Sequence, residues 1–187
     1  NETRAEHIMT VEDPIEFLHT HKRCIVNQRE VFADPKSFAQ ALKHILRQDP
    51  DVVLVGEMRD LETIEAALTI AETGHLVLST LHTNGAKESI NRITDSFPSE
   101  AKGALLRMLS LTLKGVVSQR LIRRADGAGR VACFEVMICS PTIQQLIEKG
   151  AIDDMAKAIE SSSSYYRMQS FNQSLAEFVN KRMITKE

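Results

Sequence analysis

Short apolar runs alternate with amphipathic helical patterns over the first half of the sequence. Val52–Val55 is a run of four apolar residues, which is typical of a strand buried on both faces of a parallel sheet. A helical pattern at 34–48 precedes this run, and a second at 61–73 follows it, with Gly74 where a left-handed cap is expected. The alternation predicts βαβ units, and therefore an α/β fold with a mostly parallel sheet.

The other segments follow from the same periodicities. We predict strands at 8–11 and 76–81, helices at 86–97 and 99–117, a hairpin of 120–122 and 131–138 around the turn-rich residues 125–129, and helices at 141–149, 152–159 and 171–181. Residues 161–166 are serine- and tyrosine-rich and predict a connector. The chain is therefore expected to divide into an α/β core at 1–140 and a C-terminal helical subdomain at 141–187.

Composition narrows the class of protein. The hydrophobic content of 43% and charged content of 26% are ordinary for a globular protein. A net charge of −2 gives no basis for a broad nucleic-acid or anionic-lipid footprint. The three cysteines form no CxxC pair, which favours a reduced, cytoplasmic setting.

Acidic and imidazole groups follow several of the expected strands. They occur in EDPIEF at 12–17, in the GEMRD that follows Val52–Val55, and in GHLVLSTLHT at 74–83, while NQRE at 27–30 is a fourth polar segment. Ligands bind at the carboxyl ends of strands in open α/β sheets. Glu57 is placed to bind Mg²⁺ there, and Glu16 to orient or deprotonate a water. The alternatives are a solvated Glu16 and packed, hydrogen-bonded His75 and His82.

A metal site is a further alternative for these residues. His75, His82 and the two glutamates are all of ligating type, but they lack the i, i+4 spacing of a helical zinc motif. A metal-dependent hydrolase is accordingly the most distant hypothesis.

Three segments together resemble the secretion ATPase superfamily, which drives type II secretion and type IV pili. EDPIEF resembles its Asp box, LVGEMRD its atypical Walker B element, and AETGHLVLSTLHT its His box, in the same order and spacing. The resemblance covers about residues 8–181. It implies a RecA-like P-loop NTPase core with a mostly parallel sheet, followed by the C-terminal helical subdomain.

Within the superfamily, the chain is most similar to the twitching-motility retraction ATPases, the PilT/PilU group. NQRE, HILRQDPDVVLVGEMRDLET, VVSQRLI and GRVACFEVM carry this resemblance. The absence of CxxC disfavours the assembly and secretion branch, which carries a four-cysteine zinc insert. TIQQLI at 142–147 replaces an AIRNLI-type motif and is nearer the PilU form, which implies an accessory retraction role.

The resemblance implies roles for particular residues. Glu16 would be the catalytic base or water-orienting carboxylate. Glu57 would hold Mg²⁺, through water, and the hydrolytic water. His75 and His82 would sense the γ-phosphate of ATP. All four side chains are expected to converge at one rim of one sheet.

Arginines complete the implied site. Arg29 and Arg47 are candidates for phosphate or inter-subunit contacts. Arg59 and Asp60 are instead expected to be structural, and to lock the end of the strand by an ion pair.

No phosphate loop is found within these residues. The motif GxxxxGK[ST] needs a glycine followed by lysine, and none of the eight glycines has one. The family's phosphate loop would precede Asn1, so the chain is expected to be the C-terminal part of a longer ATPase and inactive alone.

The implied whole is a homohexamer, peripheral to the cytoplasmic face of the inner membrane. It would act on an inner-membrane pilus platform protein, with a sister retraction ATPase as a further partner and no nucleic acid. An assembly or export ATPase and a catalytically silent ring partner are the alternatives.

Overall fold

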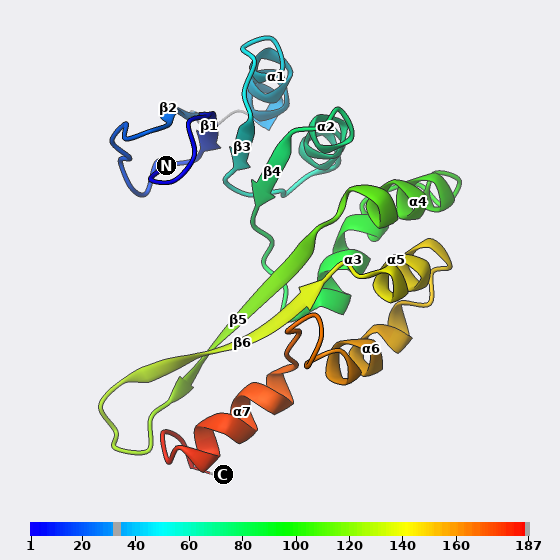
Figure 1. Cartoon of the computed structure of the whole chain (residues 1–187). Helices are drawn as coiled ribbons and strands as arrows, with labels where there is room; N and C mark the ends of the chain where they lie inside the picture. The colour runs from blue at the N-terminus through cyan, green and yellow to red at the C-terminus, as the bar shows by residue number, and fades with distance from the viewer. Residues whose placement is uncertain (32–34, 186–187) are drawn as a thin grey trace. The chain divides into compact units, whose positions relative to one another are not determined.

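Two compact units, Asn1–His82 and Thr83–Glu187, make up the chain, and the computed structural model describes residues 1–31 and 35–185 (Figure 1). The elements of unit 1 are β1 (His7–Glu12), β2 (Ile25–Glu30), α1 (Pro35–Ile45), β3 (Val52–Val55), α2 (Leu61–Glu72) and β4 (Leu76–Ser79).

The four strands of unit 1 form one parallel sheet. Their order is β2-β1-β3-β4, and every neighbouring pair is parallel. Val11 lies opposite Val55, and Val55 lies opposite Ser79, so β1, β3 and β4 end at the same edge. The predicted α/β fold with a mostly parallel sheet is confirmed.

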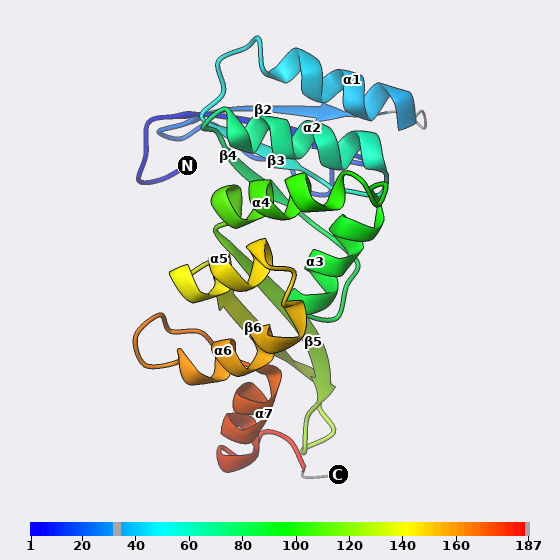
Figure 2. The ribbon, with the colours of Figure 1, turned by 90° about the vertical axis from the view of Figure 1, so that its right-hand side faces the viewer.

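Helices α1 and α2 cover one face of this sheet and bury its apolar side chains. In Figure 2 both helices lie in front of the strands. The core they enclose, whose removal from water stabilises the unit, consists of Met9, Val11, Val31, Leu42, Ile45, Val53, Val55, Ala67 and Ile70.

The two helices differ slightly from their predicted bounds. The predicted start of the first helix at Asp34 lies outside the described residues. Its last turn ends at Ile45, before the predicted end at 48, and Asp49 has a left-handed φ of 51°. In the second helix, Asp60 is the N-cap, because its Oδ1 accepts a hydrogen bond of 2.9 Å from the Thr63 N–H.

Strand β2 is absent from the sequence-based prediction. Its six residues, IVNQRE, are mostly polar and show no continuous apolar run. It is the edge strand of the sheet, where polar side chains can remain in water. NQRE therefore lies inside a strand instead of following one.

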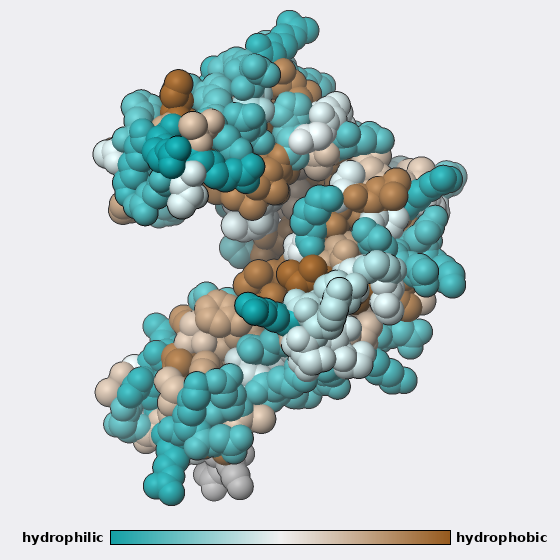
Figure 3. Space-filling model, viewed as in Figure 1, coloured by the Kyte–Doolittle hydropathy of each residue, from teal (hydrophilic) through white to brown (hydrophobic). Residues whose placement is uncertain are grey.

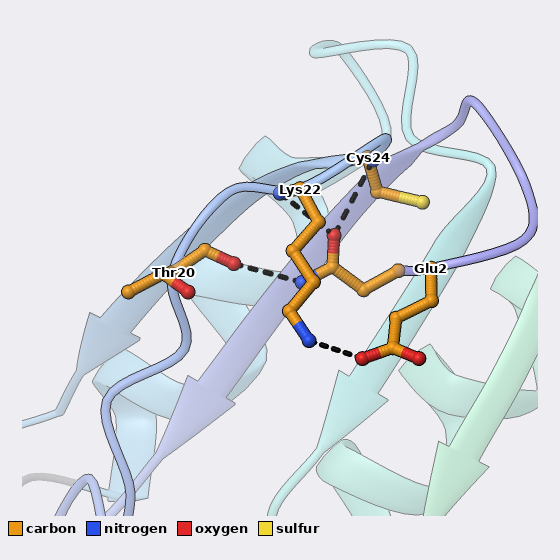
Figure 4. Close-up of polar contacts among 5 residues, drawn as sticks. Glu2, Thr20, Lys22 and Cys24 are labelled. Atoms are coloured by element: carbon orange, nitrogen blue, oxygen red, sulfur yellow. Dashed lines mark hydrogen bonds and ion pairs between the residues drawn. The ribbon is translucent and has the colours of Figure 1, made fainter.

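The segment between β1 and β2 is tied to the first residues of the chain (Figure 4). The Asn1 side chain donates to the Thr20 carbonyl at 2.8 Å and accepts from the amides of Lys22 and Cys24 at 3.0 and 3.3 Å. Lys22 also forms an ion pair with Glu2. These contacts fix the end of the segment that enters β2.

Unit 2 combines an antiparallel hairpin with helices. Its elements are α3 (Ala86–Asp95), α4 (Lys102–Thr112), β5 (Gly115–Arg123), β6 (Arg130–Ile138), α5 (Pro141–Glu148), the 3₁₀ turn η1 (Ile152–Asp154), α6 (Met155–Ser161) and α7 (Phe171–Asn180). The predicted hairpin, the three C-terminal helices and the connector after Ser161 are confirmed.

The two faces of the hairpin differ. Cys133 and Met137 are fully buried on one face. On the other, Val117, Leu121 and Ile138 are 68%, 52% and 38% exposed. Figure 3 shows apolar side chains gathered over β5 and β6. Only one face of this two-stranded sheet is therefore covered within unit 2.

The predicted helix at 99–117 was too long. Helix α4 ends at Thr112, and Leu113 is already extended with ψ 129°. Gly115 begins β5, where a Cβ atom would lie 2.8 Å from the Met137 carbonyl oxygen. The close approach of the two backbones, together with the β-branched Val116 and Val117, favours a strand here.

The predicted boundary between an α/β core and a helical subdomain, at residues 140 and 141, falls inside unit 2. The division into these two domains stays a prediction. Across residues 1–31 and 35–185, no helix has the length and apolar character needed to cross a bilayer.

Candidate functional site

Three loops leave the carboxyl edge of the parallel sheet, after β1, β3 and β4. Backbone hydrogen bonds join them: Gly56 N–H donates to the Val11 carbonyl at 2.8 Å, and Met58 N–H donates to the Thr80 carbonyl at 3.2 Å. The Thr80 hydroxyl also donates to the Gly56 carbonyl at 2.5 Å. The loop that carries Glu57 is therefore held from both neighbouring strands.

Glu57 and His82 meet at this edge, as the sequence predicted. The Glu57 side chain is 21% exposed, and its Oε1 lies 3.0 Å from His82 Nε2. Its Oε2 accepts a hydrogen bond of 2.7 Å from Arg59 Nε. Both oxygens of the carboxylate thus have a partner, one imidazole and one guanidinium.

The predicted pairing of Arg59 with Asp60 is wrong. Arg59 forms its ion pair with Glu57, while both oxygens of Asp60 accept hydrogen bonds from Thr63 as the cap of α2. Asp60 is structural, as expected, but Arg59 belongs to the site.

Glu16 lies four residues beyond β1, in the loop at the same edge of the sheet. Its side chain is exposed. Within the described part of the chain, no hydrogen bond or ion pair involves this carboxylate. It is free to meet a ligand or a water.

His75 lies at the opposite edge, so the expectation that four side chains converge is wrong for this residue. It immediately precedes β4, while His82 follows it. A strand of four residues spans about 13 Å at a rise of about 3.3 Å per residue. Its Nδ1 contacts the Thr73 hydroxyl at 3.0 Å and the Ile70 carbonyl at 3.1 Å. A role of His75 at a nucleotide site stays a prediction, and it would require a nucleotide group at the amino-terminal edge.

The two candidate arginines are exposed. Arg29, near the end of β2, donates to Gln48 Oε1 at 3.2 Å. Arg47 lies in the turn after α1, next to Gln48, and its amide donates to the His44 carbonyl at 3.2 Å. Neither forms an ion pair with a described residue. Their phosphate or inter-subunit contacts stay predictions.

Several polar groups at this edge lie in the segments that the sequence analysis singled out but were given no role there. The Glu12 carboxylate accepts from the Thr10 hydroxyl at 2.6 Å and from Gln28 Nε2 at 3.0 Å. Glu30 accepts from the Ile15 amide at 3.0 Å. Residues 27–30 are all polar, so no alternation in the sequence shows that Gln28 and Glu30 share one side of a strand.

Ser79, the last residue of β4, is another missed group. Its hydroxyl oxygen is buried, and it has no hydrogen-bond partner among the described residues. Buried polar atoms usually have partners, so this hydroxyl is an exception among the described residues.

No group of three or more His, Cys, Asp or Glu within residues 1–31 and 35–185 is arranged to hold a metal ion by itself. Mg²⁺ does not need such a group, since it is usually bound by one or two carboxylates together with substrate phosphates and water. The single carboxylate of Glu57 at the end of a buried strand fits that donor set.

The sequence matches a known protein family. The sequence model of the family described as type II/IV secretion system protein matches residues 1–185. The chain therefore belongs to that family.

Individual relatives are similar over the whole chain. The type IV pilus retraction ATPase PilT of Pseudomonas aeruginosa is 50% identical over all 187 residues, and the type IV pilus ATPase PilU of the same organism is 44% identical over the same length. The chain spans 54% and 49% of these two relatives. Although residues 142–147 are nearer the PilU form, the chain as a whole is more similar to this PilT than to this PilU.

A solved structure agrees with the fold. The crystal structure of the pilus retraction motor PilT with bound ADP superposes with a TM-score of 0.89 at 46% identity, covering 99% of this chain and 52% of that one.

We predict that Gly56→Ala distorts the site. An added Cβ would lie 3.1 Å from the Val11 carbonyl oxygen and 3.3 Å from Glu12 Cα, both of which are backbone atoms. Since the backbone yields little, the variant should lose about 1–3 kcal/mol of stability in unit 1. Hydrogen exchange of the β1 and β3 amides measures this loss.

Gly103→Ala is the matched control. Gly103 lies in α4, and nothing lies within 4 Å of its added Cβ. Alanine is the better helix former there, so this variant should be stabilised by about 0.5–1 kcal/mol. Equal exchange rates in β1 and β3 for Gly56→Ala and the unaltered protein would contradict the close-approach argument.

Proposed function

We propose that this chain supplies the Walker B and Asp-box side of the ATP-hydrolysing site of a pilus retraction motor with a RecA-like core. The observation that carries the proposal is the Glu57 carboxylate, held at the carboxyl edge of the sheet by His82 and Arg59. It is supported by the 50% identity to PilT over the whole chain and by the ADP in a PilT structure.

Glu57 holds Mg²⁺ in this proposal, through water. When bound, the ion would supply charge neutralisation for the phosphates. The chain's own contribution is to deliver a carboxylate from a buried strand with little freedom, because Arg59, His82 and the Gly56 backbone fix it.

Glu16 acts as the base or the water-orienting carboxylate. Its freedom from hydrogen bonds suits this role, since a carboxylate with open acceptor sites can take a proton from water. His82 senses the γ-phosphate in this scheme, because its ring touches Glu57 while its side chain is 83% exposed. His75, Arg29 and Arg47 remain proposed contacts to nucleotide or to a neighbouring subunit.

The whole protein acts as a homohexamer at the cytoplasmic face of the inner membrane. It turns an inner-membrane platform protein and so depolymerises the pilus, alone or with a sister retraction ATPase. These parts of the proposal rest on the similarity to PilT and PilU.

We expect Glu57→Ala and Glu16→Ala to abolish most ATP hydrolysis in the full-length protein. Losing a general base typically costs about 10²–10⁴ in rate, and losing the Mg²⁺ carboxylate removes charge neutralisation. Steady-state phosphate release measures the effect, with the exposed Glu65→Ala in α2 as control. Rates near that control in both variants would overturn the assigned roles.

The isolated 187 residues should bind ATP very weakly and turn over essentially none. Without glycine amides and a lysine around the phosphates, most of the binding energy for a triphosphate is missing. Mg²⁺-dependent hydrolysis by this piece alone, above the rate of its Glu57→Ala variant, would refute the expectation.

Deletion of the gene separates retraction from assembly or export. A retraction motor removes pili from the surface, so its loss should leave cells hyperpiliated, as counted by electron microscopy. Loss of pili would instead favour an assembly ATPase.

A further inference from the structure

Backbone groups of the two residues that flank Glu16 are bound by side chains of the neighbouring strand β2. On one side, the Ile15 amide donates to Glu30 Oε2 at 3.0 Å. On the other, the Phe17 carbonyl accepts from Gln28 Nε2 at 2.9 Å. The backbone that carries the proposed catalytic carboxylate is therefore held at two points from one strand.

The orientation of the Gln28 amide is fixed by its other partners. Its Oε1 accepts from the His19 amide at 2.7 Å, while its Nε2 also donates to Glu12 at 3.0 Å. An exchanged amide would place oxygen against the carboxylate of Glu12 and the carbonyl of Phe17, which are both acceptors. Gln28 thus makes three hydrogen bonds in one defined orientation, two to the loop and one to Glu12 at the end of β1.

Strand geometry explains why these two residues act together. Gln28 and Glu30 are two residues apart and so project from the same side of β2. They lie opposite Thr10 and Glu12 of β1, the strand that leads into the loop. Arg29, between them, projects from the other side and does not contact the loop.

The far end of the loop is anchored separately. Asn1 binds the backbone at Thr20, Lys22 and Cys24 (Figure 4). The loop is therefore held at its middle by β2 and at its end by the first residues. The Glu16 side chain itself has no hydrogen bond or ion pair with any described residue.

We propose that Gln28 and Glu30 are positioning residues that hold the backbone of Glu16 so that its free carboxylate points to the reacting water. The inference rests on the proposed function of Glu16. Their contribution is orientation, where displacements of about 1 Å can cost about 10² in rate. They contact neither nucleotide nor water in this role.

Variants of Gln28 and Glu30 in the full-length protein test the proposal. Gln28→Leu removes two hydrogen bonds to the loop and one to Glu12 at similar volume, and Glu30→Leu removes the one to the Ile15 amide. Both should lower kcat for ATP about 10- to 100-fold and leave KM within about twofold, because ground-state binding is untouched. Glu30→Gln keeps an acceptor for the Ile15 amide and should restore most of kcat. Asn27→Ala, on the other side of β2, is the control.

Two further measurements distinguish positioning from general loss of structure. Hydrogen exchange should rise at residues 15–19 in Gln28→Leu but not in β3 or α2. In a Glu16→Gln background, Gln28→Leu should cause no further loss of kcat, since the group that it positions is already gone.

The outcomes separate this inference from the proposed function. If the Glu16→Gln variant is slow but both leucine variants keep a normal kcat, this inference fails while the proposed role of Glu16 stands. The inference also fails if the losses of kcat in the Glu16→Gln, Gln28→Leu double variant are additive. It fails as well if the kcat of Glu30→Gln is as low as that of Glu30→Leu. If Glu16→Gln hydrolyses ATP at the normal rate, the proposed role of Glu16 fails and the inference with it.

Discussion

The hydrogen bond from the Gly56 amide to the Val11 carbonyl determines where the chain leaves the sheet. It extends the pairing of β1 and β3 by one residue beyond the end of β3, so the backbone is still in register when Glu57 begins. Glycine suits this position because an added Cβ would lie 3.1 Å from the Val11 carbonyl oxygen and 3.3 Å from Glu12 Cα, so the backbone would have to shift by a few tenths of an ångström. On the other side, the Thr80 hydroxyl donates a hydrogen bond to the Gly56 carbonyl. The position of the carboxylate therefore follows from strand pairing more than from its own contacts.

Periodicity sufficed for the elements with strong apolar signals. The run Val52–Val55 and the helical patterns around it predicted β3, α1 and α2 closely, because burial on both faces of a sheet demands an unbroken apolar strand. Strand β2 escaped prediction because an edge strand needs fewer apolar side chains. The end of α4 was misplaced because a glycine and two valines follow good helix formers without a proline.

The candidate site was predictable only in part. Parallel strands end at a common edge, which placed Glu57 and His82 together from the sequence alone. The same rule separates His75 from them, because β4 lies between the two histidines. Hydrophobic periodicity did not predict the contacts between side chains and distant backbone, such as those of Gln28 with Phe17 and His19. They depend on how a loop folds back over the sheet, which hydrophobic patterns do not encode.

The double engagement of Glu57 bears on electroneutrality at the proposed site. Without nucleotide, the guanidinium of Arg59 serves as the counter-ion of this carboxylate. The carboxylate that would bind a divalent cation through water is therefore already paired on both oxygens, with Arg59 on Oε2 and His82 on Oε1. Since the Arg59 side chain is 68% exposed, its guanidinium can part from the carboxylate without breaking a buried contact.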